Sequence, residues 1–286
     1  MNKKMTIYRE RIEAYLEQCF LSDEPQKTLF EAMRYSLLAG GKRLRPILVL
    51  AFCDLCGGDM EAVLPFAAAV EMVQTYSLIH DDLPCMDNDE LRRGKPTNHR
   101  VYGEANALLA GDALLTAAFG QLASAKLPPE RIVEAVRVLS RCAGELGMVG
   151  GQILDMASEE RTLTEQEVLA IQSRKTGALI SAACQLGVVA AGGTKLEQKA
   201  AGEYADALGL AFQIRDDVLD VIGDAGILGK ATGMDETKNT FVRLYGLEAC
   251  EKMIREKTQA AIAALSCFEN TDFLSKLALS LQDRDR

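Results

Sequence analysis

The residues that could do chemistry gather in one acidic stretch, residues 79–94, which reads Ile-His-Asp-Asp-Leu-Pro-Cys-Met-Asp-Asn-Asp-Glu-Leu-Arg-Arg-Gly. Carboxylates at this spacing repel one another unless a cation joins them. Mg²⁺ binds one or two carboxylates together with substrate phosphates and waters, and arginine binds phosphate through a fork of donors. The stretch therefore indicates a magnesium-bridged phosphate site, with a solvated charged turn as the alternative. Its charged members are Asp81, Asp82, Asp87, Asp89, Glu90, Arg92 and Arg93.

A second acidic cluster, Asp216-Asp217-Val-Leu-Asp220, favours the metal site over the charged turn. On a helix Asp216 and Asp220 are four residues apart and share a face. The surrounding residues are almost all apolar. Aspartates in such a helix are costly to bury unless positive charge meets them.

Three basic segments could bind the phosphates. The first places three cations where a helix begins after a double glycine, and helix N-termini attract anions. Each segment alone is typical of an exposed basic turn. Together they supply enough positive charge for two phosphorylated ligands. The segments are Gly40-Gly-Lys42-Arg43-Leu-Arg45-Pro46, Arg174-Lys175-Thr176-Gly177, and Gly229-Lys230 with Lys238.

The usual side chains of nucleophilic catalysis are sparse. The chain has two histidines, and no G-x-S-x-G, Walker or Rossmann motif occurs. His80 is interpreted as a structural hydrogen-bonding group beside the aspartates. The chemistry is therefore predicted to be metal-driven departure of a phosphate or diphosphate.

Composition excludes several classes of protein. The 286 residues are 48% hydrophobic and carry a net charge of −9, which argues against nucleic acid or an anionic membrane as a general partner. The chain contains no run of about 18 uncharged apolar residues, so no membrane span is predicted. The N-terminus lacks the pattern of a signal peptide, and the scattered cysteines are typical of free thiols in a reducing cytoplasm. We expect a cytoplasmic protein without stable membrane insertion.

Helical spacing dominates the chain, and no convincing strand pattern is found. Pro84 is expected to end or kink the helix before it, so that Asp87 comes round beside Asp81. Thr164 and Glu167 have the spacing of a capping box. We predict a single all-α domain over residues 1–286, with a loop at 223–240. The predicted helices cover about 6–20, 25–37, 43–56, 61–80, 104–125, 130–145, 165–191, 195–222 and 244–282.

Taken in order, these motifs resemble the trans-isoprenyl diphosphate synthases, most closely the bacterial-type farnesyl diphosphate synthases. The resemblance covers nearly the whole chain, and two aspartate-rich motifs with the lysine-arginine motif form a specific signature. It implies an all-α bundle around a central cavity and a homodimer. Further matching segments are Leu109-Ala-Gly-Asp112-Ala-Leu, Gly150-Gly-Gln152 and Phe212-Gln213-Ile-Arg-Asp216.

The resemblance also implies a reaction. Mg²⁺, three ions per active site, holds an allylic diphosphate through Asp81, Asp87 and Asp216, supported by Asp82 and Asp220. Departure of diphosphate leaves an allylic carbocation, the double bond of isopentenyl diphosphate attacks it, and a proton is lost. The implied contacts to the allylic diphosphate are Arg92, Lys175, Thr176, Gln213 and Lys230. The implied contacts to isopentenyl diphosphate are Lys42, Arg45, Arg93 and the residue at position 74.

Product length depends on the helix before the first motif. Tyr76 lies five residues before Asp81, about 7.5 Å along a helix. Tyr76, with its neighbour Ser77, resembles the stop that limits a growing chain at C15, farnesyl diphosphate. The alternative is that the Tyr76 ring packs in the core and that another residue limits the length of the product. A longer product, geranylgeranyl diphosphate or beyond, remains the alternative reading of the function.

Two positions depart from the family pattern. Gln74 stands where many relatives have histidine, and it offers a neutral hydrogen bond instead of a charged one. The segment 229–242 is shorter than usual, so Lys238 is left out of the predicted site. A terpene cyclase or a non-catalytic synthase subunit is disfavoured by the intact basic and acidic motifs. An EF-hand is excluded because the glycine at its sixth loop position is absent.

Overall fold

The computed structural model describes residues 2–158, 161–228 and 240–283. Over these residues the regular structure is helical, apart from one two-stranded hairpin, which confirms the predicted all-α fold class. In chain order the elements are α1 (Asn2–Gln18), α2 (Lys27–Leu37), α3 (Leu44–Leu55), α4 (Leu64–Asp81), β1 (Leu91–Arg92), β2 (Lys95–Pro96), α5 (Asn98–Tyr102), α6 (Glu104–Ser124), α7 (Pro129–Ala143), α8 (Met148–Met156), α9 (Glu165–Gln172), the π-helix η1 (Ser173–Gly177), α10 (Ala178–Ala191), α11 (Lys195–Leu228), α12 (Phe241–Tyr245), α13 (Leu247–Ala264), the 3₁₀-helix η2 (Leu265–Cys267) and α14 (Asp272–Gln282).

The backbone packing divides the chain into two compact units. The N-terminal unit consists of Asn2–Arg137 and Leu186–Gly192. The C-terminal unit consists of the described residues of Val138–Gln185 and Gly193–Arg286. The single domain predicted over residues 1–286 stays a prediction.

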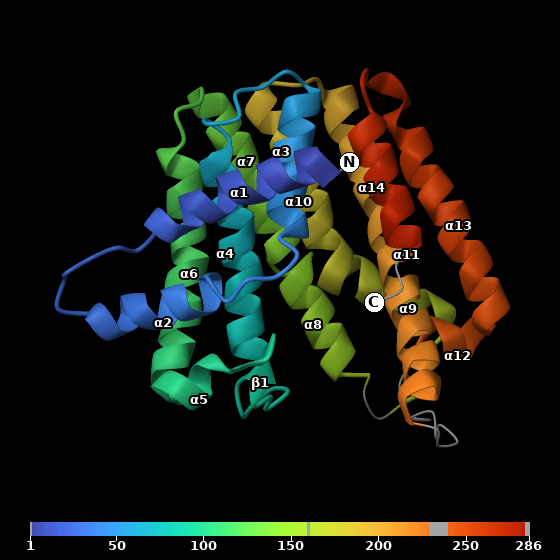
Figure 1. Cartoon of the computed structure of the whole chain (residues 1–286), viewed down its shortest axis with the longest axis horizontal. Helices are drawn as coiled ribbons and strands as arrows, with labels where there is room; N and C mark the ends of the chain where they lie inside the picture. The colour runs from blue at the N-terminus through green and yellow to red at the C-terminus, as the bar shows by residue number, and fades with distance from the viewer. Residues whose placement is uncertain (1, 159–160, 229–239, 284–286) are drawn as a thin grey trace. The chain divides into compact units, whose positions relative to one another are not determined.

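The N-terminal unit is built around α4. This helix is apolar on nearly every side, as expected of a helix in the middle of a core. It packs against α1, α2 and α3 and runs side by side with α6 (Figure 1). Its buried side chains fix the position of its C-terminal end, which carries Asp81.

The predicted end of α4 at Pro84 is confirmed. The helix stops at Asp81, three residues before the proline, and the chain then turns back. The backbone N–H of Asp87 donates to the carbonyl oxygen of Asp81 at 2.8 Å. The turn thus brings the first and third aspartates of the motif together, as the sequence predicts.

The C-terminal unit is built around α11 and α13, which lie side by side (Figure 1). Ile214 and Val218 on α11 bury one face of that helix. Their position leaves Asp216 and Asp220 on a different face. Ile214 and Val218 belong to a hydrophobic cluster that comprises Leu163, Val168, Ile171, Ile214, Val218, Phe241, Val242, Cys250 and Ile254.

Several short elements differ from the sequence expectations. The hairpin β1–β2 and the five-residue helices α5 and α12 were not predicted, because elements this short carry no measurable periodicity. Residues 223–228 continue α11, so the predicted loop over 223–240 is wrong for those residues. The tail, predicted to be helical over about 244–282, is helical and consists of α13, η2 and α14 after the end of α12.

α9 begins with the predicted capping box. The Glu167 carboxylate accepts from the Thr164 backbone N–H at 2.9 Å, and Arg161 lies 2.8 Å from its other oxygen. These contacts, led by the backbone hydrogen bond, lower the pKa of Glu167 to about 2.

We expect Glu167→Gln to lower the melting temperature slightly near pH 7, since the amide keeps the acceptor but loses the charge. A folded pKa below the unfolded value gives stability that is present above about 4.5 and lost as pH falls towards 2. The difference from wild type should therefore narrow between pH 5 and pH 3. Calorimetric scans over this range test it, and a constant difference would contradict the charge argument.

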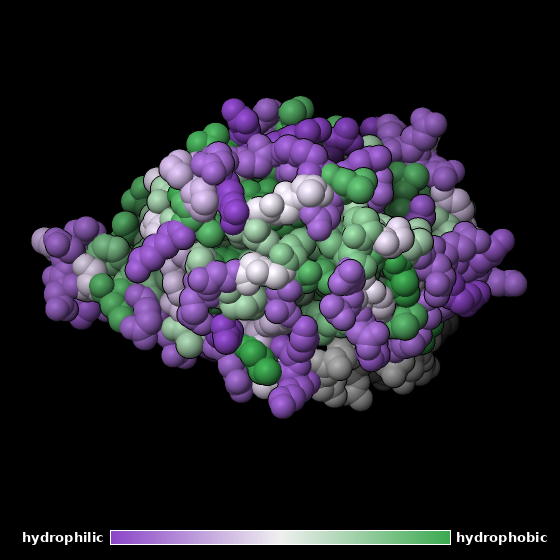
Figure 2. Space-filling model, turned by 90° about the horizontal axis from the view of Figure 1, so that it is seen from above, coloured by the Kyte–Doolittle hydropathy of each residue, from purple (hydrophilic) through white to green (hydrophobic). Residues whose placement is uncertain are grey.

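α6 exposes apolar side chains. Among the described residues it is the one helix long and apolar enough, by length and composition alone, to cross a membrane, and a third of that apolar window is buried. Leu108 and Leu109 are 47% and 54% exposed. The molecular face drawn in Figure 2, taken over all its helices, mixes hydrophobic residues with hydrophilic ones. Exposed apolar side chains, such as those of α6, are also typical of a protein–protein interface.

Candidate active site

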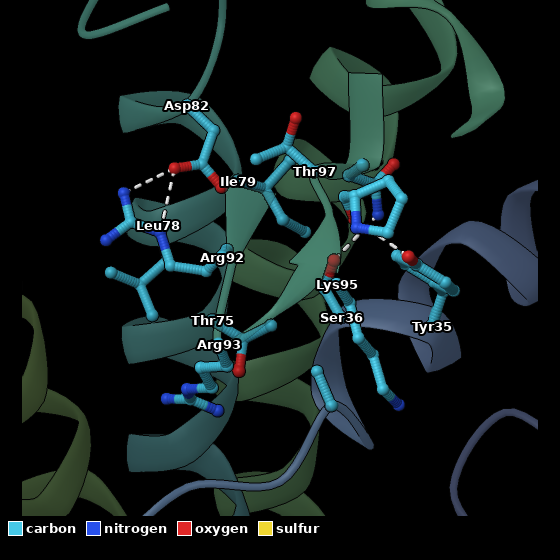
Figure 3. Close-up of a pocket in the computed structure, with 13 residues that line it drawn as sticks. Tyr35, Ser36, Thr75, Leu78, Ile79, Asp82, Arg92, Arg93, Lys95 and Thr97 are labelled. Carbon is cyan, nitrogen blue, oxygen red and sulfur yellow. Dashed lines mark hydrogen bonds and ion pairs between the residues drawn. The ribbon is translucent and has the colours of Figure 1, made fainter. Parts of the chain in front are cut away.

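The first aspartate-rich motif is stabilised by the hairpin that follows it. Arg93 and Gly94 have φ of 55° and 75°, the left-handed conformations of a tight two-residue hairpin turn. The hairpin directs Arg92 towards the end of α4, where its Nε lies 2.9 Å from Asp82 Oδ1 (Figure 3). Its Nη2 lies 3.0 Å from Asp89 Oδ2. Arg92 Nη2 also contacts Asp82 Oδ1. Asp82 therefore supports the motif by holding an arginine.

The hairpin and the helix α5 that follows it are both tied to α2. The Asn98 amide donates to the carbonyl oxygen of Ala32 and to the Ser36 hydroxyl, both at 2.8 Å, and the Tyr35 hydroxyl donates to the carbonyl oxygen of Pro96. Tyr35, Ser36, Pro96 and Asn98, together with Arg92 and Asp82, line a cavity of about 30 Å³ (Figure 3). The space suits a water molecule and is too small for a substrate. It belongs to the support of the motif.

Arg43 has a structural role that the sequence does not reveal. Its side chain is 0% exposed and lies 2.5 Å from Glu71 and 2.8 Å from Glu13. It also donates to the carbonyl oxygen of Leu37 at 2.8 Å. The middle cation of the first basic segment therefore fixes the start of α3 against α4 and is not available to a ligand.

The other cations of this region remain suited to an anion. Burial lowers the pKa of Arg45 to about 10, with Glu71 opposing the shift and Arg93 adding to it. Partial desolvation lowers the pKa of Arg93, and the neighbouring Arg43 and Arg92 charges lower it further. Cations that lose stability through burial and mutual repulsion gain it when an anion binds. The remaining basic residue, Lys42, is exposed.

Two buried polar atoms lack partners here, and of these the Arg45 donor suits an anion whereas the Gln74 oxygen needs a donor such as water. The Nε of Arg45 and the Oε1 of Gln74 are buried without a hydrogen-bond partner. Such atoms are rare in folded proteins and indicate a group that a ligand or water completes. The side-chain amide of Gln74 offers both donors and an acceptor for that purpose.

The predicted product-length residues lie on α4. Tyr76 is 6% exposed, and its ring meets the His80 ring edge to face, with centroids 5.6 Å apart. His80 Nε2 lies 3.0 Å from the carbonyl oxygen of Leu108, which agrees with its predicted structural role. The Ser77 hydroxyl donates to the Gln74 carbonyl oxygen. Tyr76 is therefore a bulky, ordered side chain one turn before the first aspartate motif.

In the second aspartate-rich motif, Asp217 has a structural role, whereas Asp216 and Asp220 are partly or fully exposed. Asp217 Oδ2 accepts from the backbone N–H of Phe241 at 2.7 Å and so ties α11 to α12. Burial raises the pKa of Asp217 to about 6. Arg215 forms two hydrogen bonds with Glu251 on α13. Asp216 and Gln213 are half-buried, and Asp220 is exposed.

Lys175 and Thr176 lie in the π-helix η1, between α9 and α10. π-helical turns are rare and often occur at functional sites. Lys175 Nζ lies 2.6 Å from Asp155 Oδ2 on α8. Asp155 was not among the predicted site residues, although it follows Gly150-Gly-Gln152 and is four residues from Gly151. That spacing was the available signal.

The donor set fits magnesium in part. Within residues 2–158, 161–228 and 240–283, no three His, Cys, Asp or Glu side chains converge closely enough to hold a metal ion. The hydrogen bond between Asp87 and Asp81 does bring together two carboxylate-bearing residues, the number that magnesium usually takes from a protein. The addition of Asp216 to this pair stays a prediction, and Lys230 lies outside the described residues.

Comparisons with known proteins show the family of the chain. The family model described as Polyprenyl synthetase matches residues 26–274. The chain is 44% identical to the heterodimeric geranylgeranyl pyrophosphate synthase large subunit 2 of Arabidopsis thaliana, over 95% of this chain and 73% of the relative.

Solved structures give the same result. An FPP/GFPP synthase from Zymomonas mobilis has a TM-score of 0.88 and 38% identity, with 99% of this chain and 100% of that chain covered. A geranyltransferase from Legionella pneumophila has a TM-score of 0.89 and 35% identity, with 99% and 97% covered. These matches confirm the resemblance to the trans-isoprenyl diphosphate synthases and their helical fold. The chain therefore belongs to the polyprenyl synthetase family and is a prenyltransferase.

Proposed function

We propose that this prenyltransferase condenses isopentenyl diphosphate head to tail with dimethylallyl or geranyl diphosphate in a Mg²⁺-dependent reaction. The observation that carries the proposal is the pair of Arg45 and Arg93, whose positive charges, together with the buried and unpaired Nε of Arg45, suit a diphosphate. The side-chain N–H groups of Gln74 can donate to the same ligand. A terpene cyclase has a single diphosphate substrate and needs no such second anion site.

Each residue has a proposed part in the reaction. Lys42, Arg45 and Arg93 hold isopentenyl diphosphate. Magnesium bound by Asp81, Asp87 and Asp216 would supply positive charge to the leaving diphosphate. The allylic carbon–oxygen bond breaks, the double bond of isopentenyl diphosphate forms the new carbon–carbon bond, and the released proton passes to the departing diphosphate. The side chains proposed to hold the allylic diphosphate are Arg92, Lys175, Thr176, Gln213 and Lys230.

Product length has two candidates. The relative from Arabidopsis thaliana is named as a geranylgeranyl pyrophosphate synthase, which favours a C20 product. The buried ring of Tyr76 favours the C15 product, farnesyl diphosphate, because a bulky side chain at this point would shorten the space for the chain. The names of the relatives support the C20 reading at least as well as the C15 reading.

We expect Tyr76→Ala to lengthen the main product by at least one C5 unit, because it removes the ring that would stop the growing chain. Chromatography of the dephosphorylated alcohols measures this. Tyr102→Ala is the matched control, since Tyr102 also lies in an edge-to-face ring pair, with Tyr35, and should keep the product unchanged. An unchanged product in Tyr76→Ala would place the stop elsewhere.

Product analysis of the wild-type protein tests the proposed function. Purified protein is incubated with isopentenyl diphosphate, dimethylallyl diphosphate and Mg²⁺, with EDTA in the control. A C15 or C20 alcohol that disappears with EDTA supports the proposal and decides the product length. No condensation would reject it in favour of a cyclase or a non-catalytic subunit, which geranyl and farnesyl diphosphate alone would then distinguish.

A homodimer is the proposed assembly, with α6 at its interface. Leu108 and Leu109 are exposed on that helix, and apolar side chains of this kind are typical of subunit contacts. We expect Leu109→Glu to shift the protein towards monomer in sedimentation velocity. Leu146→Glu alters a leucine that is 65% exposed in the other unit and should leave the assembly unchanged. An equal shift in both variants, or in neither, would reject α6 as the interface.

A further inference from the structure

The π-helix η1 brings Lys175 close to α8. Lys175 Nζ and Asp155 Oδ2 are 2.6 Å apart, and the two side chains are 32% and 42% exposed. A lysine side chain has four rotatable carbon–carbon bonds and is otherwise spread over many conformations. The ion pair selects one direction for the ammonium group.

The backbone of η1 is located by a glycine on the same face of α8. A Cβ added at Gly151 would lie 2.2 Å from the Lys175 backbone nitrogen and 2.7 Å from its Cα. These are backbone atoms that no rotamer change can move away. Gly151 therefore permits the close approach of α8 to η1, and Asp155, one helical turn later, meets the side chain of the same lysine.

We propose that Asp155 is a positioning residue for catalysis, which orients the Lys175 ammonium group towards the allylic diphosphate, with Gly151 setting the distance between α8 and η1. This rests on the proposed function, in which Lys175 binds that diphosphate. Asp155 itself does not contact substrate in this account. It acts only through Lys175.

The charges decide what this pair can contribute. A half-exposed ion pair adds little to folding stability, so its removal should leave the fold intact. Orientation of a catalytic group matters far more, since small displacements of reacting groups cost large factors in rate. The carboxylate also has the same sign as the substrate, so if it acted by general electrostatics its removal would strengthen diphosphate binding. Removal of the Asp155 carboxylate should therefore weaken diphosphate binding if Asp155 orients Lys175, and strengthen it if Asp155 acts only through its charge.

The test compares Asp155→Asn, Asp155→Glu and Lys175→Met with the double variant Asp155→Asn/Lys175→Met. We expect Asp155→Asn to lower kcat/KM for the allylic substrate by roughly 10- to 100-fold, as for other groups that orient a site residue. KM for isopentenyl diphosphate should stay within about twofold of wild type, and Asp155→Glu should recover part of the loss. In the Lys175→Met background Asp155→Asn should have no further effect. Asp272→Asn, which breaks an exposed ion pair with Lys276, is the matched control.

Binding of inorganic diphosphate with Mg²⁺, measured by calorimetry, gives a readout that does not need turnover. The proposal expects weaker binding in Asp155→Asn and no further change in the double variant. Unchanged or tighter binding, or losses that add in the double variant, would overturn it. If the wild-type protein did not condense the two substrates but the variants still showed these changes in diphosphate binding, only the proposed reaction would be rejected. Gly151→Ala should weaken binding as well, and Asp155→Asn remains decisive if that variant fails to fold.

Discussion

Asp81→Ala and Asp216→Ala are each expected to lower kcat by roughly 10²- to 10³-fold or more, the scale of losing one group that stabilises charge in the transition state. Both carboxylates are proposed to bind the magnesium that neutralises the leaving diphosphate. The fold should persist, because Asp81 is the last residue of α4, where a negative charge opposes the helix dipole. Steady-state rates over a range of Mg²⁺ concentrations, with far-ultraviolet circular dichroism, measure both effects.

The control for this experiment is Asp272→Ala, which removes an exposed carboxylate at the start of α14. It should keep the wild-type rate and the wild-type requirement for Mg²⁺. If Asp81→Ala or Asp216→Ala retained a near-normal rate, the metal assignment for that residue would be wrong. Loss of helical signal together with activity would show a folding defect and would require Asp→Asn variants at the same positions.

The sequence predicts two kinds of structural element: helices whose apolar pattern extends over many turns, and features whose partners are close neighbours in the chain. α4 and α11 have apolar patterns over many turns, and Pro84 marks the end of α4 because it cannot continue the helix. The capping box at Thr164 is likewise local, since both partners lie within one turn. Short elements such as β1, β2 and α12 escape prediction because packing against neighbours stabilises them more than their own sequences do.

The division of labour among like-charged neighbours could not be predicted. Arg43 and Arg45 are two positions apart, yet Arg43 pairs with Glu71 and Glu13, which are 28 and 30 positions away. Asp155 lies 20 positions before its partner Lys175. Only the tertiary arrangement reveals which charged group holds the structure and which is left for a ligand.

Arg43→Met is expected to lower the free energy of unfolding by about 3–5 kcal/mol, the usual cost of removing one partner from a buried ion pair. The Glu71 side chain is 5% exposed, and without Arg43 its charge would keep only the coulombic attraction of Arg45 and Arg93. The carbonyl oxygen of Leu37 loses its donor in the same change. Urea or guanidinium titration at neutral pH measures the difference.

Two further variants separate this effect from a general sensitivity of the basic segment. Lys42→Met removes the exposed neighbouring cation and should change the free energy of unfolding by about 0.5 kcal/mol or less, as surface substitutions usually do. Arg43→Met combined with Glu71→Gln removes both charges, so it should recover part of the loss. Equal destabilisation by Lys42→Met and Arg43→Met would contradict the buried pair. If the pair is confirmed, the first basic segment is divided, with Arg43 fixing the fold so that Arg45 can meet the substrate.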